Sequence, residues 1–225
     1  MNERRMRQSS LDSEQLPARL RHVRWIGGGS GAGKTTIARQ LAADYGLHLY
    51  DTDAMMTDHA SRSNLAVAPL LQTFIAMDMD ERWANRSPEM MFQTFHWFAG
   101  EGFELIVEDL LALPEEPLIL AEGFRLLPRL VAPLLSHPDQ AVWLIPTPEF
   151  RRVAFDSRGS TWTIAKKTSK PEQALSNLLI RDQLFTDEVA REVTDLRLRV
   201  IEVDGAVSVD ELTLCLAEYL GLSAS

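Results

Sequence analysis

A run of residues near the N-terminus has the types and spacing needed to hold phosphate groups. Residues 28–35 fit the pattern G-x-x-x-x-G-K-[ST] in full. Glycines allow such a loop to turn successive backbone N–H groups inward around phosphate oxygens. The lysine supplies positive charge to the β- and γ-phosphates, and the threonine hydroxyl can ligate Mg²⁺. The predicted nucleotide site is Gly28, Gly29, Ser30, Gly31, Ala32, Gly33, Lys34, Thr35 and Thr36.

Three acidic residues lie where two further strands are expected to end. Asp51 and Asp53 follow the apolar residues 47–50, and Glu122 follows the apolar residues 118–121. Ligands of open parallel sheets bind at the carboxyl ends of the strands, so these acids are expected beside the phosphate loop. We predict Thr35, Asp51 and Glu122 as metal ligands, with Asp51 either holding a metal-bound water or accepting a proton. The alternative is that Asp51 and Asp53 only cap a helix that begins near residue 54.

Three arginines outside the phosphate loop are candidates for binding an anionic substrate, the molecule that would accept a phosphoryl group. Arg125 follows the third expected strand, and a guanidinium can clamp a phosphate or carboxylate through two hydrogen bonds. Arg82 and Arg86 flank Trp83 in a charged and aromatic patch. That patch predicts contacts with the acceptor, or else an ordinary helix end held by ion pairs.

A second group of arginines follows the fourth expected strand. Arg151, Arg152 and Arg158 lie in a basic stretch where small kinases carry a mobile lid, and one of them could neutralise charge on a transferring phosphoryl group. The sequence does not distinguish among the three. Arg181 could add a further arginine from the far hinge of this region. With Lys34 and Asp51, the three lid arginines complete the predicted catalytic set.

Strands and helices alternate along the chain. Apolar segments predict strands at residues 22–26, 47–50, 118–121, 141–145 and 199–203, and periodicity predicts helices at 34–45, at 103–113 and from Ser208 onward. This alternation predicts an α/β fold of three layers, with a five-stranded parallel sheet covered by helices on both faces. Together with the phosphate-loop motif at residues 28–35, it predicts a P-loop NTPase fold. We expect an N-terminal arm at 1–21 and a single domain at 22–225. That domain includes a helical acceptor-binding insertion at 54–113 and a lid region at 151–185.

The aromatic segment within the insertion has two interpretations. Residues 89–98 (EMMFQTFHWF) are rich in methionine and aromatic side chains. Such a run is typical of a core face, and the alternative is a wall of the acceptor pocket. His96, flanked by two aromatic residues, and Cys215, in an apolar stretch, are expected to be structural.

Composition limits the classes of partner and compartment. The net charge of −9 argues against broad nucleic-acid binding, which needs a basic surface. No stretch approaches the roughly 20 apolar residues of a membrane span. The single cysteine fits a reducing compartment, so a cytoplasmic protein without membrane contact is expected.

The chain also resembles known kinase families. The stretch WIGGGSGAGKTTIARQLAADYGLHLYDTDAMM resembles the opening of shikimate kinase and gluconate kinase-like proteins. LILAEGFRLLP is similar to the third-strand region of adenylate kinase-type enzymes, and VIEVDG to the close of many small-molecule and nucleotide kinases. The resemblance implies a P-loop kinase that uses ATP and Mg²⁺. It also implies that Asp53 hydrogen-bonds an acceptor hydroxyl.

Three functions are consistent with these patterns. The first is an ATP-dependent transfer of the γ-phosphate to a small hydroxylated or phosphorylated metabolite, which the Asp-Thr-Asp sequence favours. The second is a nucleoside or nucleoside monophosphate kinase, which the adenylate kinase-like segment favours. The third is an ATP-binding regulatory protein without transfer activity. A GTPase is not expected, because the guanine-specifying N-K-x-D segment is missing from the sequence.

Overall fold

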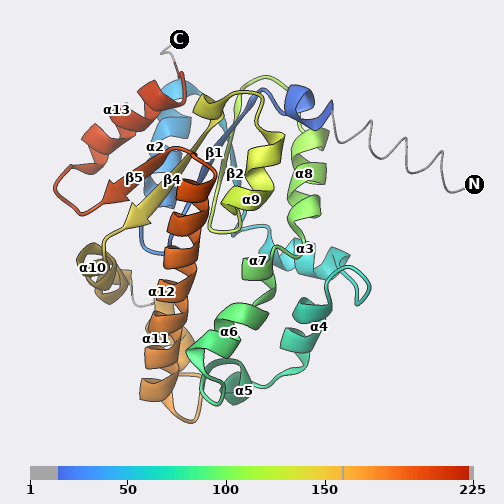
Figure 1. Cartoon of the computed structure of the whole chain (residues 1–225), viewed down its shortest axis with the longest axis vertical. Helices are drawn as coiled ribbons and strands as arrows, with labels where there is room; N and C mark the ends of the chain where they lie inside the picture. Colours follow the sequence, from blue (N-terminus) through green and yellow to red (C-terminus); the bar gives the residue numbers. More distant parts are fainter. Residues whose placement is uncertain (1–14, 159, 223–225) are drawn as a thin grey trace, which may run out of the picture.

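The computed structural model describes residues 15–158 and 160–222, without the side chains of 155–162. At its centre is a five-stranded parallel sheet in the order β2-β3-β1-β4-β5 (Figure 1). The strands are β1 (Val23–Gly28), β2 (His48–Asp51), β3 (Ile119–Glu122), β4 (Ala141–Pro146) and β5 (Val200–Val203). The predicted α/β fold is therefore confirmed.

The two faces of the sheet bury separate hydrophobic clusters, because successive side chains of a strand point to opposite faces. On one face, Trp25 and Trp143 pack with residues of the long helix α12 (Pro171–Asp195) and of α8 (Phe103–Ala112). On the other face, Ile26 and Val142 pack against α2 (Lys34–Tyr45) and α13 (Val209–Tyr219). Helices thus cover both faces, which makes three layers (Figure 1).

The segment between β2 and β3 is helical, as the sequence predicts. It contains α3 (Met56–Arg62), α4 (Pro69–Ala76), α5 (Met79–Trp83), α6 (Pro88–Thr94), α7 (His96–Ala99) and α8. Ser87 begins α6, because its side chain accepts a hydrogen bond from the backbone N–H of Met90. Helices α4, α5 and α6 extend beyond one end of the sheet, where α5 and α6 contact α12 (Figure 1).

Further helices lie between the remaining strands. They are α9 (Pro128–Val131), η1 (Ala132–Leu134), η2 (Pro138–Gln140), α10 (Pro148–Arg158) and α11 (Ser160–Ala165). Before β1, residues 15–19 are helical and Leu20 is fully buried in the core. This part of the expected arm therefore packs on the domain, and residues 1–14 lie outside the described residues. Among the helices of the described chain, none combines the length and apolar character that crossing a membrane requires.

Candidate active site

The loop from β1 to α2 has the backbone shape that its glycines allow. Gly28, Gly31 and Gly33 have φ angles of 128°, 84° and 80°. A Cβ on Gly28 would lie 2.1 Å from the carbonyl oxygen of Leu144, so the loop also depends on glycine for its close approach to β4. Helix α2 then begins with no side-chain cap and no acidic residue in its first turn. Its N-terminal N–H groups are suited to bind an anion.

Lys34 lies at the start of α2, directly beside this loop. Its side chain is buried, and its Nζ donates a hydrogen bond to the carbonyl oxygen of Gly29 at 2.8 Å. The ammonium group therefore stays over the loop, where phosphate oxygens would meet it.

Asp51 and Glu122 are placed side by side by the sheet. They are paired residues at the ends of β2 and β3, and Glu122 is also paired with Ile26 of β1. Glu122 is fully buried, and neither of its carboxylate oxygens has a hydrogen-bond partner among the described residues. Burial raises the pKa of Glu122 to about 7, although Thr35 and Lys34 lie close enough to oppose this rise. A buried carboxylate without a partner is expected to bind a cation or a proton.

Asp51 has a structural role as well as its place beside Glu122. Its Oδ1 accepts hydrogen bonds from the backbone N–H groups of Asp53 and Ala54, at 2.9 and 3.0 Å. The capping alternative is thus partly right for Asp51, although α3 begins two residues later at Met56.

Asp53 faces a cavity of about 300 Å³ that starts at the phosphate loop. Burial raises the pKa of Asp53 above its usual range, and the nearby charge of Lys34 counteracts part of this rise. The cavity continues from the loop to the insertion and α12. Its lining outside the loop includes Asp53, Trp83, Phe95, Phe98, Phe124 and Arg181.

Arg181, on α12, is a cationic side chain in the lining of this cavity. It is buried, and it lies over the rings of Trp83, Phe95 and Phe98, with its Cζ 4.8–5.2 Å from their centroids. Its Nε and Nη2 donate to Asp182 Oδ1, whereas its Nη1 has no hydrogen-bond partner among the described residues. A buried donor in this position is suited to an anionic group of a bound molecule.

The prediction that Arg82 and Arg86 bind the acceptor is not supported. Arg82 donates to the carbonyl oxygens of Phe74 and Ile75 at the end of α4. Arg86 donates to two backbone carbonyl oxygens and to Thr94 Oγ1. Neither side chain lines the cavity, so the alternative of a locally bonded helix end describes them better.

Arg125 is buried, and it too is not among the residues that line the cavity. Its Nη1 donates to the carbonyl oxygen of Thr52 and to His59, and its Nη2 donates to the carbonyl oxygen of Gly102. Its guanidinium lies 4.0 Å from the ring centroid of Trp97. These hydrogen bonds occupy both Nη1 and Nη2, the two groups that would otherwise bind an acceptor, so Arg125 is not placed to bind one directly.

The three lid arginines fall in different positions. Arg151 is buried. It lies beside the phosphate loop, since a Cβ added to Gly31 would be 3.3 Å from Arg151 Cγ. Its Nη2 donates to the carbonyl oxygen of Leu179 in α12. Arg152 is exposed. The side chain of Arg158 lies outside the described residues.

Comparison with known proteins supports the resemblance seen in the sequence. The family model for shikimate kinase matches residues 30–67, which include most of the phosphate loop, α2, β2 and α3. The resemblance to a P-loop kinase family is confirmed for this segment. Among curated proteins, none matches the chain significantly.

Three solved structures resemble the fold at low identity. Shikimate kinase from Acinetobacter baumannii, in complex with shikimate, is 22% identical, with 90% of this chain and 95% of that chain covered and a TM-score of 0.41. Thymidylate kinase from Candida albicans is 15% identical, with 88% and 90% covered and a TM-score of 0.44. An uncharacterized protein from Eubacterium ventriosum is 14% identical, with 88% and 97% covered and a TM-score of 0.45.

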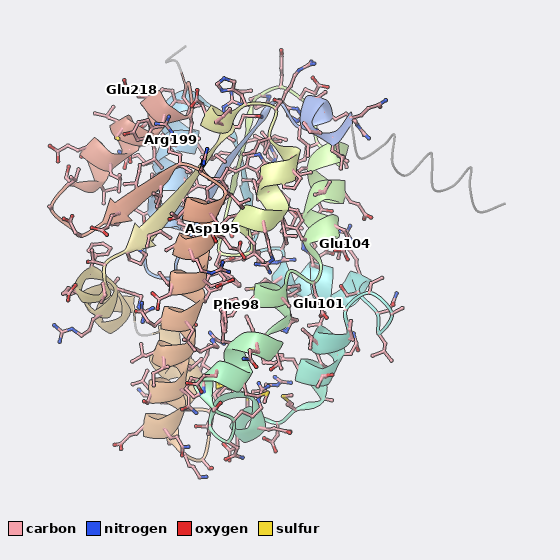
Figure 2. The ribbon with its side chains drawn as sticks, viewed as in Figure 1. Phe98, Glu101, Glu104, Asp195, Arg199 and Glu218 are labelled. Atoms are coloured by element: carbon pink, nitrogen blue, oxygen red, sulfur yellow. The ribbon has the colours of Figure 1, made fainter. Side chains whose placement is uncertain are left out.

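The aromatic segment of the insertion serves both of its interpretations. Phe95 and Phe98 line the cavity, whereas Met91 and Trp97 are buried in hydrophobic clusters. Phe98 extends from α7 (Figure 2), and its ring stacks on Phe185 of α12 with centroids 4.0 Å apart. His96 is buried among aromatic rings, and burial lowers its pKa to about 3, which agrees with a structural role.

Proposed function

We propose that this protein is a P-loop phosphotransferase that moves the γ-phosphate of Mg·ATP to a hydroxyl group of a small anionic acceptor. The observation that carries the proposal is the continuous cavity that joins Lys34 and Thr35 to Asp53 and Arg181. The phosphate loop forms one part of the lining. Asp53, Arg181 and several aromatic side chains form another part.

The phosphate end has groups that fit both the nucleotide and the metal. The phosphate loop and the N-terminal N–H groups of α2 would bind the phosphates, and Lys34 would neutralise their charge. Thr35, Asp51 and Glu122 would hold Mg²⁺, directly or through water, and the unpartnered carboxylate of Glu122 supports this assignment. When bound, Mg²⁺ supplies positive charge that stabilises the transferring phosphoryl group.

Asp53 is the proposed group that orients the acceptor hydroxyl and accepts its proton. It lines the same cavity as the phosphate loop and the aromatic side chains. Its pKa is raised by burial, so its carboxylate is a stronger base than that of an exposed aspartate. Asp51 helps to fix its position, because Asp51 Oδ1 accepts a hydrogen bond from the Asp53 backbone N–H.

Arg181 is the proposed anchor for an anionic group of the acceptor. Its unpartnered Nη1 and the surrounding rings favour an acceptor that carries a carboxylate or phosphate on a compact apolar frame. Arg151 lies beside the loop, whereas Arg152 is exposed, so of these two described side chains Arg151 is the proposed group that neutralises phosphoryl charge. The insertion at 54–113 and the lid region at 151–185 would enclose the acceptor between them.

A second candidate function is favoured by the aromatic lining of the cavity. Trp83, Phe95, Phe98 and Phe124 offer flat apolar surfaces of the kind that planar ring systems contact. A nucleoside or nucleoside monophosphate is therefore the alternative acceptor class.

A combined binding and turnover screen tests the proposal. Thermal stability and ADP formation would be measured with Mg·ATP, alone and with hydroxy acids, sugars, nucleosides and nucleoside monophosphates. One acceptor is expected to raise the melting temperature beyond Mg·ATP and to drive ADP formation, and Lys34→Met should abolish both effects. The exposed Arg39→Met on α2 is the control. Stabilisation by Mg·ATP with no ADP formation from any acceptor would support the regulatory alternative instead.

A further inference from the structure

A buried network behind the acceptor cavity connects the end of β2 to three helices of the insertion. Arg125 is its centre, with only 3% of its surface exposed. The Nη1 group donates to the Thr52 carbonyl oxygen at 3.3 Å and to His59 Nδ1 at 2.9 Å. Nη2 donates to the Gly102 carbonyl oxygen at 3.1 Å. One side chain therefore holds the residue between Asp51 and Asp53, helix α3, and the connection from α7 to α8.

The contacts of His59 fix which ring nitrogen carries its proton. A guanidinium only donates hydrogen bonds, so His59 Nδ1 must be the acceptor from Arg125. Nε2 then carries the hydrogen and donates it to Asp109 Oδ2 at 2.7 Å. His59 is fully buried, and burial together with the charge of Arg125 lowers its pKa. The ring is thus neutral, in a single tautomer.

Asp109 anchors the other end of this network on α8. It accepts a hydrogen bond from the Tyr50 hydroxyl at 2.7 Å and another from Arg62 Nη1 at 2.7 Å. Tyr50 belongs to β2, so Asp109 connects α8 and α3 to the same strand whose end carries Asp51. Hydrogen bonds therefore form a continuous series that connects Tyr50, Asp109, His59, Arg125 and Thr52.

A metal site at this place is not consistent with the hydrogen bonds. Oxygen and nitrogen atoms of Asp58, His59 and Asp109 lie within 4.8 Å of one another. However, Nδ1 of His59 faces a guanidinium and Nε2 carries a hydrogen, so neither nitrogen offers a lone pair to a cation. The network instead connects the end of β2 to α3 and α8 through hydrogen bonds.

We propose that Arg125 and His59 are positioning residues that fix the Thr52–Asp53 peptide, and through it the Asp53 carboxylate, at the wall of the acceptor cavity. The bond from Arg125 reaches the carbonyl oxygen of this peptide, and the bond from Asp51 reaches its N–H group. The same peptide is thus held on both sides. The importance of the Asp53 position for turnover rests on the proposed function, whereas the support of the peptide does not.

Hydrogen exchange tests the support directly, without an acceptor. In the full-length protein with Mg·ADP, Arg125→Gln should raise the exchange rates of the Asp53 and Ala54 amides by about tenfold or more, with smaller changes in β1 and β4. Arg24→Gln is the matched control, because Arg24 is another arginine that donates to backbone carbonyl oxygens, far from this site. Unchanged rates at residues 53 and 54 in Arg125→Gln would overturn the proposal. An equal rise across the sheet would also overturn it, since that would show only general destabilisation.

Two further measurements separate positioning from simple packing. In ¹⁵N NMR spectra at pH 7, His59 should be neutral with hydrogen on Nε2, and an imidazolium or an Nδ1–H form would contradict the network. His59→Asn keeps an acceptor near the position of Nδ1, so it should raise exchange at residues 53 and 54 less than His59→Leu does. Equal effects of the two variants would count against His59.

The acceptor screen distinguishes this inference from the proposed function. With any acceptor that drives ADP formation, Arg125→Gln should lower kcat at least tenfold and change KM for Mg·ATP less than twofold. If no acceptor gives turnover, the proposed function fails, while the exchange and NMR results still decide whether Arg125 and His59 hold the Thr52–Asp53 peptide.

Discussion

Asp51 and Glu122 are paired residues at the carboxyl ends of the adjacent strands β2 and β3, yet they are used differently. Oδ1 of Asp51 bonds two backbone N–H groups, whereas Glu122 has no hydrogen-bond partner among the described residues for either oxygen. The first carboxylate shapes the turn that carries Asp53. The second is held buried at the edge of the phosphate loop, where its charge is unfavourable until a cation or a proton arrives.

Glu122 should therefore make the stability of the metal-free protein depend on pH. The folded pKa of about 7 lies above the ordinary value of 4.5, so between these values the folded protein binds a proton that the unfolded chain has lost. The free energy of unfolding should then fall as pH rises from about 5 to about 8. The loss attributable to this group should be on the order of 1–3 kcal/mol.

Urea unfolding at several pH values, without Mg²⁺, measures this effect. Glu122→Gln should be more stable than the wild type at pH 8, with the difference shrinking towards pH 5. Glu202→Gln, at an exposed position of β5, is the control for loss of a carboxylate. If the wild type and Glu122→Gln differ equally at pH 5 and pH 8, Glu122 does not titrate as described.

Asp51, the last residue of β2, and Asp53, which follows the strand, should affect turnover in different ways when each is replaced by asparagine. Asp53→Asn removes the proposed proton acceptor, so turnover should fall by about 10²- to 10⁴-fold while Mg·ADP binding is retained. Asp51→Asn keeps an oxygen that can bond the N–H groups of residues 53 and 54, but it removes a negative charge beside the metal site. Its turnover should also fall sharply, with a higher Mg²⁺ requirement.

Kinetics over a range of Mg²⁺ concentrations separate these two roles. Asp44→Asn, an exposed position of α2, is the control. If Asp51→Asn keeps normal turnover at every Mg²⁺ concentration, its assignment as a metal ligand is wrong. If Asp53→Asn does, then Asp53 neither orients nor deprotonates the acceptor.

The fold and the phosphate end of the site could be predicted because their signals are local. Each strand is a short apolar run, the phosphate loop is contiguous, and the acids follow strands whose ends must meet at one edge. The caps at Ser87 and Ser208 are local too, since each serine bonds an N–H three residues ahead.

The acceptor end could not be predicted in the same way, because arginine is used there for two purposes. Arg82, Arg86 and Arg125 all bond backbone carbonyl oxygens from other turns or elements, and no sequence pattern shows which carbonyl groups will be nearby. Arg181 differs by lying on the α12 face that packs towards the insertion. Its helical position beside Asp182 was visible in the sequence, but the rings around it come from a segment about 80 to 100 residues earlier.

Arg181 should control the affinity for the acceptor and not for the nucleotide. Loss of a charge-assisted hydrogen bond costs about 1.5–3 kcal/mol, so Arg181→Met should raise KM for the acceptor roughly 10- to 100-fold. Arg181→Lys should recover only part of this loss, because an ammonium does not reproduce the planar guanidinium. KM for Mg·ATP should change little.

Initial-rate measurements with both substrates varied provide this comparison. Arg191→Met is a matched control, because Arg191 lies on the same helix but pairs with Glu188 and Asp195 on the surface. A rise in KM for Mg·ATP without a change in KM for the acceptor would place Arg181 at the nucleotide instead.

Gly123 should be essential for stability, because the chain leaving β3 passes closely over the turn that carries Asp53. Its φ angle is 143°, and a Cβ there would lie 1.8 Å from Thr52 Oγ1 and 3.0 Å from Asp53 Oδ1. Gly123→Ala is expected to lower the free energy of unfolding by about 3 kcal/mol or more. Gly46→Ala is the control, because Gly46 also has a positive φ angle, but among the described residues no atom lies within 4 Å of the place that its Cβ would take. Backbone strain alone should make that variant only about 1–2 kcal/mol less stable.

A double variant shows whether contact with Thr52 causes the effect. Thr52→Ala removes the hydroxyl group that Gly123→Ala would strike, so the two changes together should destabilise less than the sum of the two single changes. Relief should be incomplete, because the added Cβ would still lie 3.2 Å from Thr52 Cβ and 3.0 Å from Asp53 Oδ1. Strict additivity in urea unfolding would mean that the two chain segments do not meet as described. Gly123 and Thr52 directly adjoin Glu122 and Asp53, so such a result would also weaken the proposed site.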